Sequence, residues 1–428
     1  MRRDNKDIIK YVNKGSSGGV IKVVAFAIVI MLVLSVLLWY IGSVINTEDG
    51  GIWNPRPDRE QTMEGDFVPG TSEADSSPVV ANPDVALTGT HYWENGGLLE
   101  LPINGATGWA AASRVTVRTE ANANASAVVT LSAGDGFTIL EGSGNWWLVE
   151  VSPTVIGWVD NRQCFINLPD VIPSIIYQNT NSSGSIKVSL GYHIPGVTGE
   201  SLYSAWAFNE RLGREEYIVP GMYSLARSLF VAQQAAMERG NSLIVNEVFR
   251  PRSAQLAVVS GMQQLMRTNP EVNTAISSPP WSLTFFISTG ISRHQRGAAV
   301  DASIATIRTY EYRQTGDFIF RQMTDYREFS MPSGLHELSP WSAIFDAPRS
   351  ITAAQMLTGN IEMRDTVTTG VRRLQEAFAR GGFTPLSSEW WHFDHADSLT
   401  LATNSGIMGT FYTPTIYSRP PVVPQGDE

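Results

Sequence analysis

The stretch SRHQRGAAVD, residues 292–301, places a histidine and an aspartate seven positions apart, with a glycine between them. Gly297 lets the chain bend between His294 and Asp301, because glycine adopts backbone angles that other residues avoid. A histidine and an aspartate at this spacing form either a hydrogen-bonded polar turn or two ligands of a metal site. Residues elsewhere in the chain decide between these two interpretations.

The composition limits the chemistry that such a site can use. The chain has 428 residues, enough for two or three domains. Its net charge of -10 argues against nucleic acid as a partner, because phosphate binding needs an excess of Lys and Arg. It contains one cysteine, Cys164, so a zinc site here requires His, Asp and Glu ligands.

A second candidate segment is EWWH, residues 389–392. Glu389 can bring a carboxylate beside a metal-bound His392, and the two tryptophans can exclude water from the site. Strict alternation along a strand would place Glu389 and His392 on opposite faces, so a bulge or a turn must bring them together. The alternative is a buried aromatic strand with an incidental histidine.

The third candidate is Arg250 in EVFRPRSAQ, residues 247–255. It ends an apolar strand and precedes a proline, which suits a fixed positive charge at the rim of a cleft. Such a charge can stabilise an oxyanion or bind a carboxylate. The alternative is a surface salt bridge.

Taken together, these segments resemble the zinc D-Ala-D-Ala dipeptidases and their carboxypeptidase relatives. The order and spacing agree over about 250 residues, from the segment 168–184 to the strand of W-W-H, and F-R-P and E-W-W-H flank the central motif on either side. That motif, S-x-H-x-x-G-x-A-x-D, is matched at Ser292, His294, Gly297, Ala299 and Asp301.

The resemblance implies one zinc ion per chain and a role for each of six residues. Three ligands would leave a fourth zinc position open for water, as a catalytic site requires. The implied roles are zinc ligation by His294, Asp301 and His392, general base and acid catalysis by Glu389, oxyanion stabilisation by Arg250, and substrate binding or support by Ser292.

One loop departs from the dipeptidase pattern. MPSGLHELS, residues 331–339, stands where the dipeptidases place an acid that binds the free amino group of the substrate. Here the position is His336, followed by Glu337, and both are candidate substrate-binding residues. A dipeptidase, a carboxypeptidase, an endopeptidase on another stem bond and a non-catalytic wall-binding or sensor protein all remain open. His395 is a possible fourth ligand or a solvated polar residue.

The N-terminus suggests a location. Residues 23–45 are uncharged and long enough to cross a bilayer core of ~30 Å. Basic residues precede them and acidic residues follow, which predicts a cytoplasmic tail over 1–22, a transmembrane helix over 23–45 and an extracytoplasmic remainder at the cell membrane. A cleaved signal peptide is the alternative. Residues 46–100 are expected to be a flexible linker.

Residues 101–167 contain short β-rich runs such as RVTVRT and NWWLVEV, separated by Gly and Asn. The order of these runs resembles a bacterial Src homology 3 domain, which implies binding to cell-wall peptides. Trp146 and Trp147 are either core residues or a ligand platform.

Residues 168–416 combine helical patterns at 221–240 and 366–382 with strand patterns at 242–249 and 383–395. Because helices and strands do not alternate strictly, an α+β zinc peptidase domain with an antiparallel sheet is expected. The complete prediction is this domain, the small all-β barrel, one N-terminal transmembrane helix and a C-terminal tail over 417–428. The expected partners are peptidoglycan peptides and the membrane.

Overall fold

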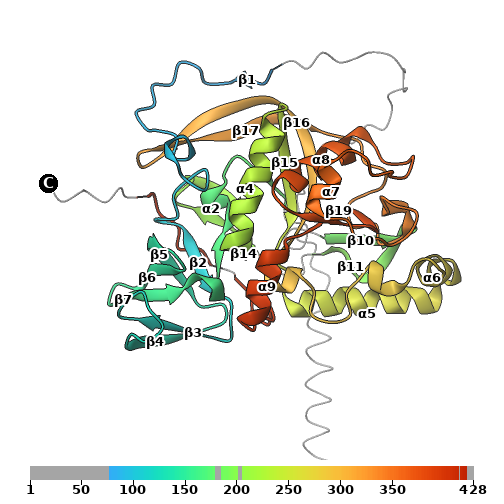
Figure 1. Ribbon diagram of the computed structural model, residues 1–428, viewed down its shortest axis with the longest axis horizontal. Helices are drawn as coiled ribbons and strands as arrows, with labels where there is room; N and C mark the ends of the chain where they lie inside the picture. The colour runs from blue at the N-terminus through green and yellow to red at the C-terminus, as the bar shows by residue number, and fades with distance from the viewer. Residues whose placement is uncertain (1–76, 179–184, 201–204, 414, 422–428) are drawn as a thin grey trace, which may run out of the picture. The chain divides into compact units, whose positions relative to one another are not determined.

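The computed structural model describes residues 77–178, 185–200, 205–413 and 415–421, and two large sheets organise them (Figure 1). The first sheet is built mainly from the N-terminal half of this region, and the second from the C-terminal half. Two smaller antiparallel pairs lie between them in the chain: β10 (Ser185–Ser189) with β11 (Tyr192–Glu200), and β12 (Trp206–Asn209) with β13 (Arg214–Tyr217).

The first sheet forms the barrel-like domain expected from the sequence. Every pairing in it is antiparallel, and alternate residues such as Val115 and Val117 are buried, as expected for strands with one face in a core. Trp147 is buried, whereas Trp146 is half-buried. In sheet order the strands are β14 (Pro220–Met222), β8 (Cys164–Asn167), β2 (Thr107–Ala110), β5 (Gly136–Ser143), β6 (Trp146–Ser152), β7 (Val155–Asp160), β3 (Arg114–Arg118) and β4 (Ala127–Ser132).

The second sheet is mixed, although most of its pairings are antiparallel as predicted. β1 pairs with β16, and β9 with β15, in parallel. β16 and β17 form a long hairpin at one side. In sheet order the strands are β18 (Thr384–Leu386), β19 (Glu389–Asp394), β16 (Ala299–Thr315), β15 (Asn241–Glu247) and β9 (Ile176–Tyr177), with β17 (Phe318–Glu328) and β1 (Val79–Val80) also paired to β16.

Two amphipathic helices cover this sheet. α4 and α8 pack side by side, with α4 on β15 and α8 on β16 (Figure 1). Their apolar faces are buried, with Leu225 and Leu229 on α4 and Leu374 and Phe378 on α8. The helices are α2 (Leu168–Val171), α4 (Tyr223–Met237), α5 (Arg252–Thr268), α6 (Pro270–Ser277), α7 (Ala353–Leu357), α8 (Thr369–Arg380) and α9 (Ala396–Asn404). The short 3-10 turns are η1 (Trp93–Asn95), η2 (Asn161–Gln163), η3 (Leu283–Phe285), η4 (His294–Arg296) and η5 (Pro340–Ser342).

The barrel is joined to the second domain through shared structure. β14, which leads directly into α4, pairs with β8 of the barrel. Phe165 on β8 packs against the rings of Phe249 and Phe411, and a Cβ at Gly297 would lie 2.7 Å from its ring. The barrel therefore supports the loop that carries the central sequence motif.

The structure corrects the expectation of a membrane-spanning helix. No helix among the residues that it describes has the length and apolar character needed to cross a bilayer. The predicted span, 23–45, lies outside the described residues, as does the tail at 1–22. The predicted fold class with a transmembrane helix, the predicted membrane partner and the predicted single-pass location are therefore not supported by the structure.

Part of the expected linker also differs from the prediction. Val79–Val80 pair with Thr309–Tyr310, and Glu100 is buried. Residues 77–100 thus lie against the folded domains, because the hydrogen-bonding edge of β16 gives this polar segment a partner.

Candidate metal centre

Three adjacent strands of the second sheet place three site residues in a row. Asp301 on β16 pairs with Glu247 on β15 on one side and with His392 on β19 on the other. Directly paired residues in neighbouring strands point to the same face, with their Cβ atoms close together. All three residues are buried, so the sheet itself fixes their spacing.

His294 reaches this row from η4, the turn just before β16. The turn ends at Gly297, whose φ of 58° lies in the left-handed region that favours glycine. The Gly297 amide donates to the carbonyl of His294, and the Gly297 carbonyl accepts from the amide of Met222. The sequence motif therefore acts as expected: glycine permits the turn that returns His294 towards Asp301.

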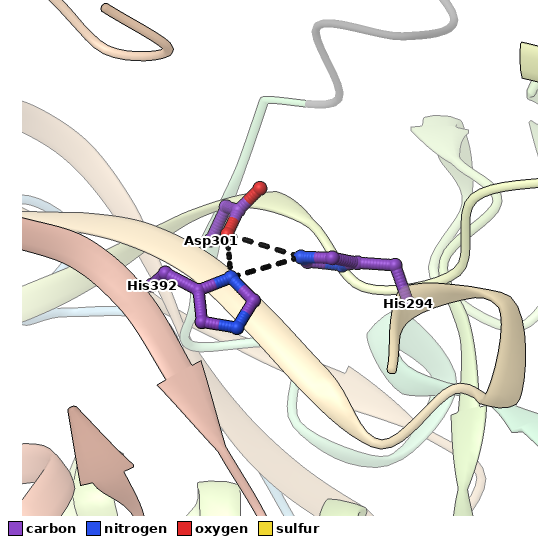
Figure 2. A group of neighbouring side chains, drawn as sticks. All are labelled: His294, Asp301 and His392. Atoms are coloured by element: carbon purple, nitrogen blue, oxygen red, sulfur yellow. Dashed lines mark hydrogen bonds and ion pairs between the residues drawn. The ribbon is translucent and has the colours of Figure 1, made fainter. Parts of the chain in front are cut away.

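His294, Asp301 and His392 converge on one point (Figure 2). The Nε2 atom of His294 lies 3.1 Å from Nδ1 of His392 and 3.2 Å from Oδ1 of Asp301. Nδ1 of His392 lies 2.9 Å from the same Asp301 oxygen. Four-coordinate zinc with bonds of ~2.0–2.1 Å holds its ligand atoms ~3.3 Å apart, which is close to these separations.

The hydrogen bonds of the outward-facing ring nitrogens determine whether the inward-facing nitrogens carry a proton or a lone pair. Nδ1 of His294 lies 2.9 Å from the carbonyl oxygen of Val248, and Nε2 of His392 lies 3.0 Å from Asp394 Oδ1. Both partners are acceptors, so both ring nitrogens donate a proton outward, and each neutral ring then turns a lone pair inward. Two lone pairs and a carboxylate oxygen face one another, which is a donor set that fits zinc.

The acidic neighbours of the cluster favour a positive charge inside it. Burial alone would lower the pKa of His392, but Asp394 and Asp301 raise it to about 10. Asp301 is also buried, yet the neighbouring histidines hold its pKa well below its ordinary value. The pocket therefore attracts positive charge, either a proton on His392 or a metal cation.

Glu389 stands beside the cluster because β19 bulges. Pro385 of β18 pairs with Phe393, but the next residue, Leu386, pairs with Glu389, so residues 390–392 have no partner on β18. The bulge brings Glu389 Oε2 to 3.9 Å from Nδ1 of His392. Burial raises the pKa of Glu389 to about 8. A carboxyl that titrates near neutrality suits proton transfer.

Arg250 lines the same cavity and is held by two side chains. Its Nε and Nη2 donate to the two oxygens of Glu247 at 2.9 and 2.5 Å, and Nη1 donates to Oε1 of Gln255 at 2.7 Å. Nη2 also lies 3.4 Å from Oδ2 of Asp301. The alternative of a surface salt bridge does not hold, because both Arg250 and Glu247 are buried.

A second acidic group overlaps the first: Glu247, Asp301 and His336 also lie close enough to hold an ion. We do not assign a second metal to it. Glu247 already pairs with Arg250 and, at 3.7 Å, with Lys187. Two cations beside one carboxylate disfavour a third.

The two substrate-loop candidates occupy different places. His336, at a left-handed φ of 60°, lines the cavity with Nε2 3.2 Å from Asp301 Oδ2, and burial and Lys187 lower its pKa to about 4. Glu337 does not line the cavity, since its carboxylate accepts from the amides of Leu190 and Gly191.

The structure also gives positions for the two remaining candidates, Ser292 and His395. Ser292 lines the cavity, and its hydroxyl accepts from the amide of Gln295. His395 is neither a ligand of the cluster nor solvated: it is buried, precedes α9, and bonds to the hydroxyls of Ser398 and Ser228.

Sequence reasoning missed four residues around the centre. Asp394 follows His392 by two positions, the strand spacing that places two side chains on one face. Glu247 precedes Arg250 by three, and Gln255 opens the helix that follows. Lys187 carried no signal, because its position in the site depends on a distant hairpin.

Comparison with known proteins gives two similarities. Residues 113–162 match the family model described as "Bacterial SH3 domain". A "D-alanyl-D-alanine dipeptidase" from Enterococcus faecium is 28% identical over 211 residues, which cover 47% of this chain and 86% of that protein. These similarities support a peptidase-type hydrolase that carries a bacterial SH3 domain, in agreement with the residues that converge on the cavity.

Proposed function

We propose that this chain is a zinc-dependent peptidase that hydrolyses a D-Ala-D-Ala-type amide bond in peptidoglycan peptides. The observation that carries the proposal is the donor set of His294, Asp301 and His392, with Glu389 at 3.9 Å from it. The similarity to a D-alanyl-D-alanine dipeptidase supports the substrate class.

Each side chain has a defined task in this proposal. When bound, zinc supplies a Lewis acid that acidifies water and polarises an amide carbonyl. Glu389 accepts the proton of the attacking water while the C–O bond forms, and then passes that proton to the nitrogen of the leaving amine as the C–N bond breaks. Arg250 opposes the negative charge that develops on the former carbonyl oxygen.

The size of the cavity fits small side chains at the scissile bond. Its volume is about 100 Å³, and Phe286, Leu338 and Trp391 contribute apolar walls. A cavity of ~150 Å³ can admit benzene, so this cavity has room for a methyl group. The apolar walls lower the local polarity, which strengthens the electrostatic interactions inside.

Digestion of defined wall peptides by the zinc-loaded full chain tests the proposal. We expect one zinc per chain, release of D-Ala that stops when a chelator removes the metal, and recovery when zinc is restored. Mass spectrometry separates the products: single D-Ala from a blocked peptide marks a carboxypeptidase, cleavage of the free dipeptide a dipeptidase, and internal cuts another bond. Full zinc loading with no cleavage of any of these peptides would refute the enzyme assignment.

A further inference from the structure

A buried lysine lines the cavity and has no role in the mechanism above. Lys187 on β10 is 1% exposed and shares the cavity with Arg250, Asp301 and Glu389. Burying an ammonium group is costly unless a negative charge compensates it. Its surroundings should therefore contain such a charge.

The nearest charge is already used. Nζ of Lys187 lies 3.7 Å from Oε2 of Glu247, which is beyond hydrogen-bonding distance, and this is the ion pair that the described residues give it. Both oxygens of Glu247 accept hydrogen bonds from Arg250 at 2.9 and 2.5 Å. Glu247 thus serves as the main partner of Arg250, and Lys187 shares it only at longer range.

The side chains around the cavity can be compared by charge, acids against cations. Among the described residues, Asp301 and Glu389 are the acids that line the cavity. Asp301 belongs to the metal centre, and Glu389 is kept for proton transfer. With a metal cation bound at Asp301, Glu247 remains as the carboxylate that Arg250 and Lys187 share among the described residues, so the charge of Lys187 is matched only at 3.7 Å.

The position of Lys187 is fixed by its strand. Val188, the next residue, bridges to Glu337: its carbonyl accepts from the amide of Leu338 at 2.7 Å, and its amide donates to the carbonyl of His336 at 3.2 Å. The strand that carries Lys187 is therefore pinned to the loop of His336. A charge held in place before the ligand arrives loses little entropy on binding.

We propose that Lys187 is a specificity-determining residue that binds a carboxylate of the substrate peptide. The inference rests on the proposed function and narrows its substrate class. Once a metal cation is bound, the described part of the cavity offers a weakly paired ammonium group and no acid that is free to hold an amino group, so it favours peptides with a blocked amino end and a carboxylate within reach of Lys187. A carboxypeptidase substrate with a free C-terminal carboxylate meets both conditions.

Three peptides test the charge that Lys187 recognises. The first is an N-acylated peptide that contains one acidic residue and ends in D-Ala-D-Ala. The second is its C-terminal amide. The third keeps the C-terminal carboxylate, but the side-chain carboxylate of its acidic residue is amidated. Steady-state kinetics compare wild type with Lys187→Met, which removes the charge, and with Lys187→Arg, which keeps it. Thermal melting of each variant shows whether it folds.

We expect wild type to prefer the acid over the amide by about 10–100-fold in kcat/KM, mainly through KM, as one charge-assisted hydrogen bond warrants. Lys187→Met should abolish that preference, and Lys187→Arg should restore much of it. If side-chain amidation has this effect instead, and Lys187→Met removes it, the side-chain carboxylate is the ligand and the inference stands.

A wild type that is indifferent to both amidations would overturn it. So would a folded Lys187→Met that loses activity equally on all three peptides, because that pattern marks a structural role. Binding to the zinc-loaded Glu389→Gln variant, measured by calorimetry, separates this inference from the proposed function. Tighter binding of the acid that depends on Lys187 supports the carboxylate site even if no peptide is cleaved, and equal binding of acid and amide contradicts it.

Discussion

Two buried polar clusters in this chain differ in how their hydrogen bonds are satisfied. In the first, the carboxylate of Asp170 on α2 accepts three hydrogen bonds. The donors are the backbone amide of Thr107 at 2.9 Å, the hydroxyl of Ser418 at 2.6 Å and the side-chain amide of Asn209 at 2.6 Å. Arg211 donates to the carbonyls of Asp170, Asn104 and Pro102. In the second, His294, Asp301 and His392 turn acceptor atoms towards one another at 2.9 to 3.2 Å.

The contrast separates a structural cluster from a functional one. The Asp170 cluster has a donor for each acceptor and connects the barrel, α2 and the C-terminal segment, so it needs nothing from outside. In the metal-type cluster, when both imidazoles are neutral, the inward-facing atoms are all acceptors, so the cluster is complete only when a proton on His392 or a metal cation supplies the missing positive charge. Burial and charge are common to both clusters, and only the match of donors to acceptors distinguishes them.

The largest effect is expected from a substitution that removes proton transfer beside the second cluster but leaves its zinc binding intact. Glu389→Gln should lower kcat by about 10²–10⁴-fold, because the amide cannot accept the proton of water. Zinc content and melting temperature should stay at wild-type values, since Glu389 is not among the three converging ligand atoms. Glu238→Gln, at an exposed side chain, is the matched control and should leave kcat unchanged. A Glu389→Gln enzyme within tenfold of wild type would remove Glu389 from the reaction.

The next largest effect is a loss of stability when the hydrogen bonds of the first cluster are removed. Asp170→Ala leaves Arg211 buried without its acidic neighbour and three donors without an acceptor, which should lower the free energy of unfolding by about 3–5 kcal/mol. Denaturant unfolding measures this loss. Asp325→Ala, which breaks an exposed pair with Arg308, should cost under about 1 kcal/mol. Zinc stoichiometry should remain one in the folded Asp170→Ala protein, and loss of zinc there would contradict the separation of the two clusters.

How far the sequence predicted these clusters follows from the distances along the chain. His294 and Asp301 lie within one turn and strand, and EWWH within one strand, so short motifs revealed them. The helices at 221–240 and 366–382 were also predicted from their apolar spacing, with ends shifted by a few residues. Local patterns carry such information because one element contains the whole signal.

The remaining features depend on contacts between distant segments. Asp170 meets Thr107 and Ser418, which lie 63 and 248 positions away, and no local pattern marks such a meeting. Lys187 enters the cavity through a hairpin bridged to Glu337. The bulge at Glu389 was foreseen only as a need for a bulge or a turn. The transmembrane helix was inferred from the hydropathy, length and flanking charges of residues 23–45, and the described residues contain no helix of that kind.

A third buried carboxylate, Glu100, has fewer hydrogen-bond donors than Asp170 but more than the inward-facing atoms of the metal-type cluster. Its pKa makes the comparison testable through the pH dependence of stability. Glu100 accepts from the amides of Ser174 at 2.9 Å and Arg321 at 3.4 Å, and burial raises its pKa from 4.5 to about 7. The folded protein therefore holds this proton more tightly than the unfolded chain. The contribution of Glu100 to the free energy of unfolding is therefore greatest below pH 4.5, should fall by about 3 kcal/mol as the pH rises to about 7, and should then level off.

Unfolding of wild type and Glu100→Gln between pH 4.5 and 8 checks this dependence. The difference between the two proteins cancels other titrating groups. We expect Glu100→Gln to lack the loss that wild type shows across this range, because the amide does not ionise. Parallel stability curves for the two proteins would mean that Glu100 does not titrate in this interval.

The smallest expected effect tests why the second cluster has no donor. Asp394 accepts the outward proton of His392 at 3.0 Å, which leaves the lone pair of Nδ1 directed inward. Asp394→Ala removes that acceptor, so the ring can protonate on its inward side or rotate. Outer partners of this kind contribute about 10–100-fold to metal affinity. Competition with a chromophoric chelator should show zinc binding weakened by this factor, whereas Asp346→Ala, at a side chain that is 90% exposed, should bind zinc as wild type does. Unchanged affinity in Asp394→Ala would show that the Val248 carbonyl and the sheet alone orient the two imidazoles, and the direction of the lone pairs would then be a consequence of the metal rather than a property of the fold.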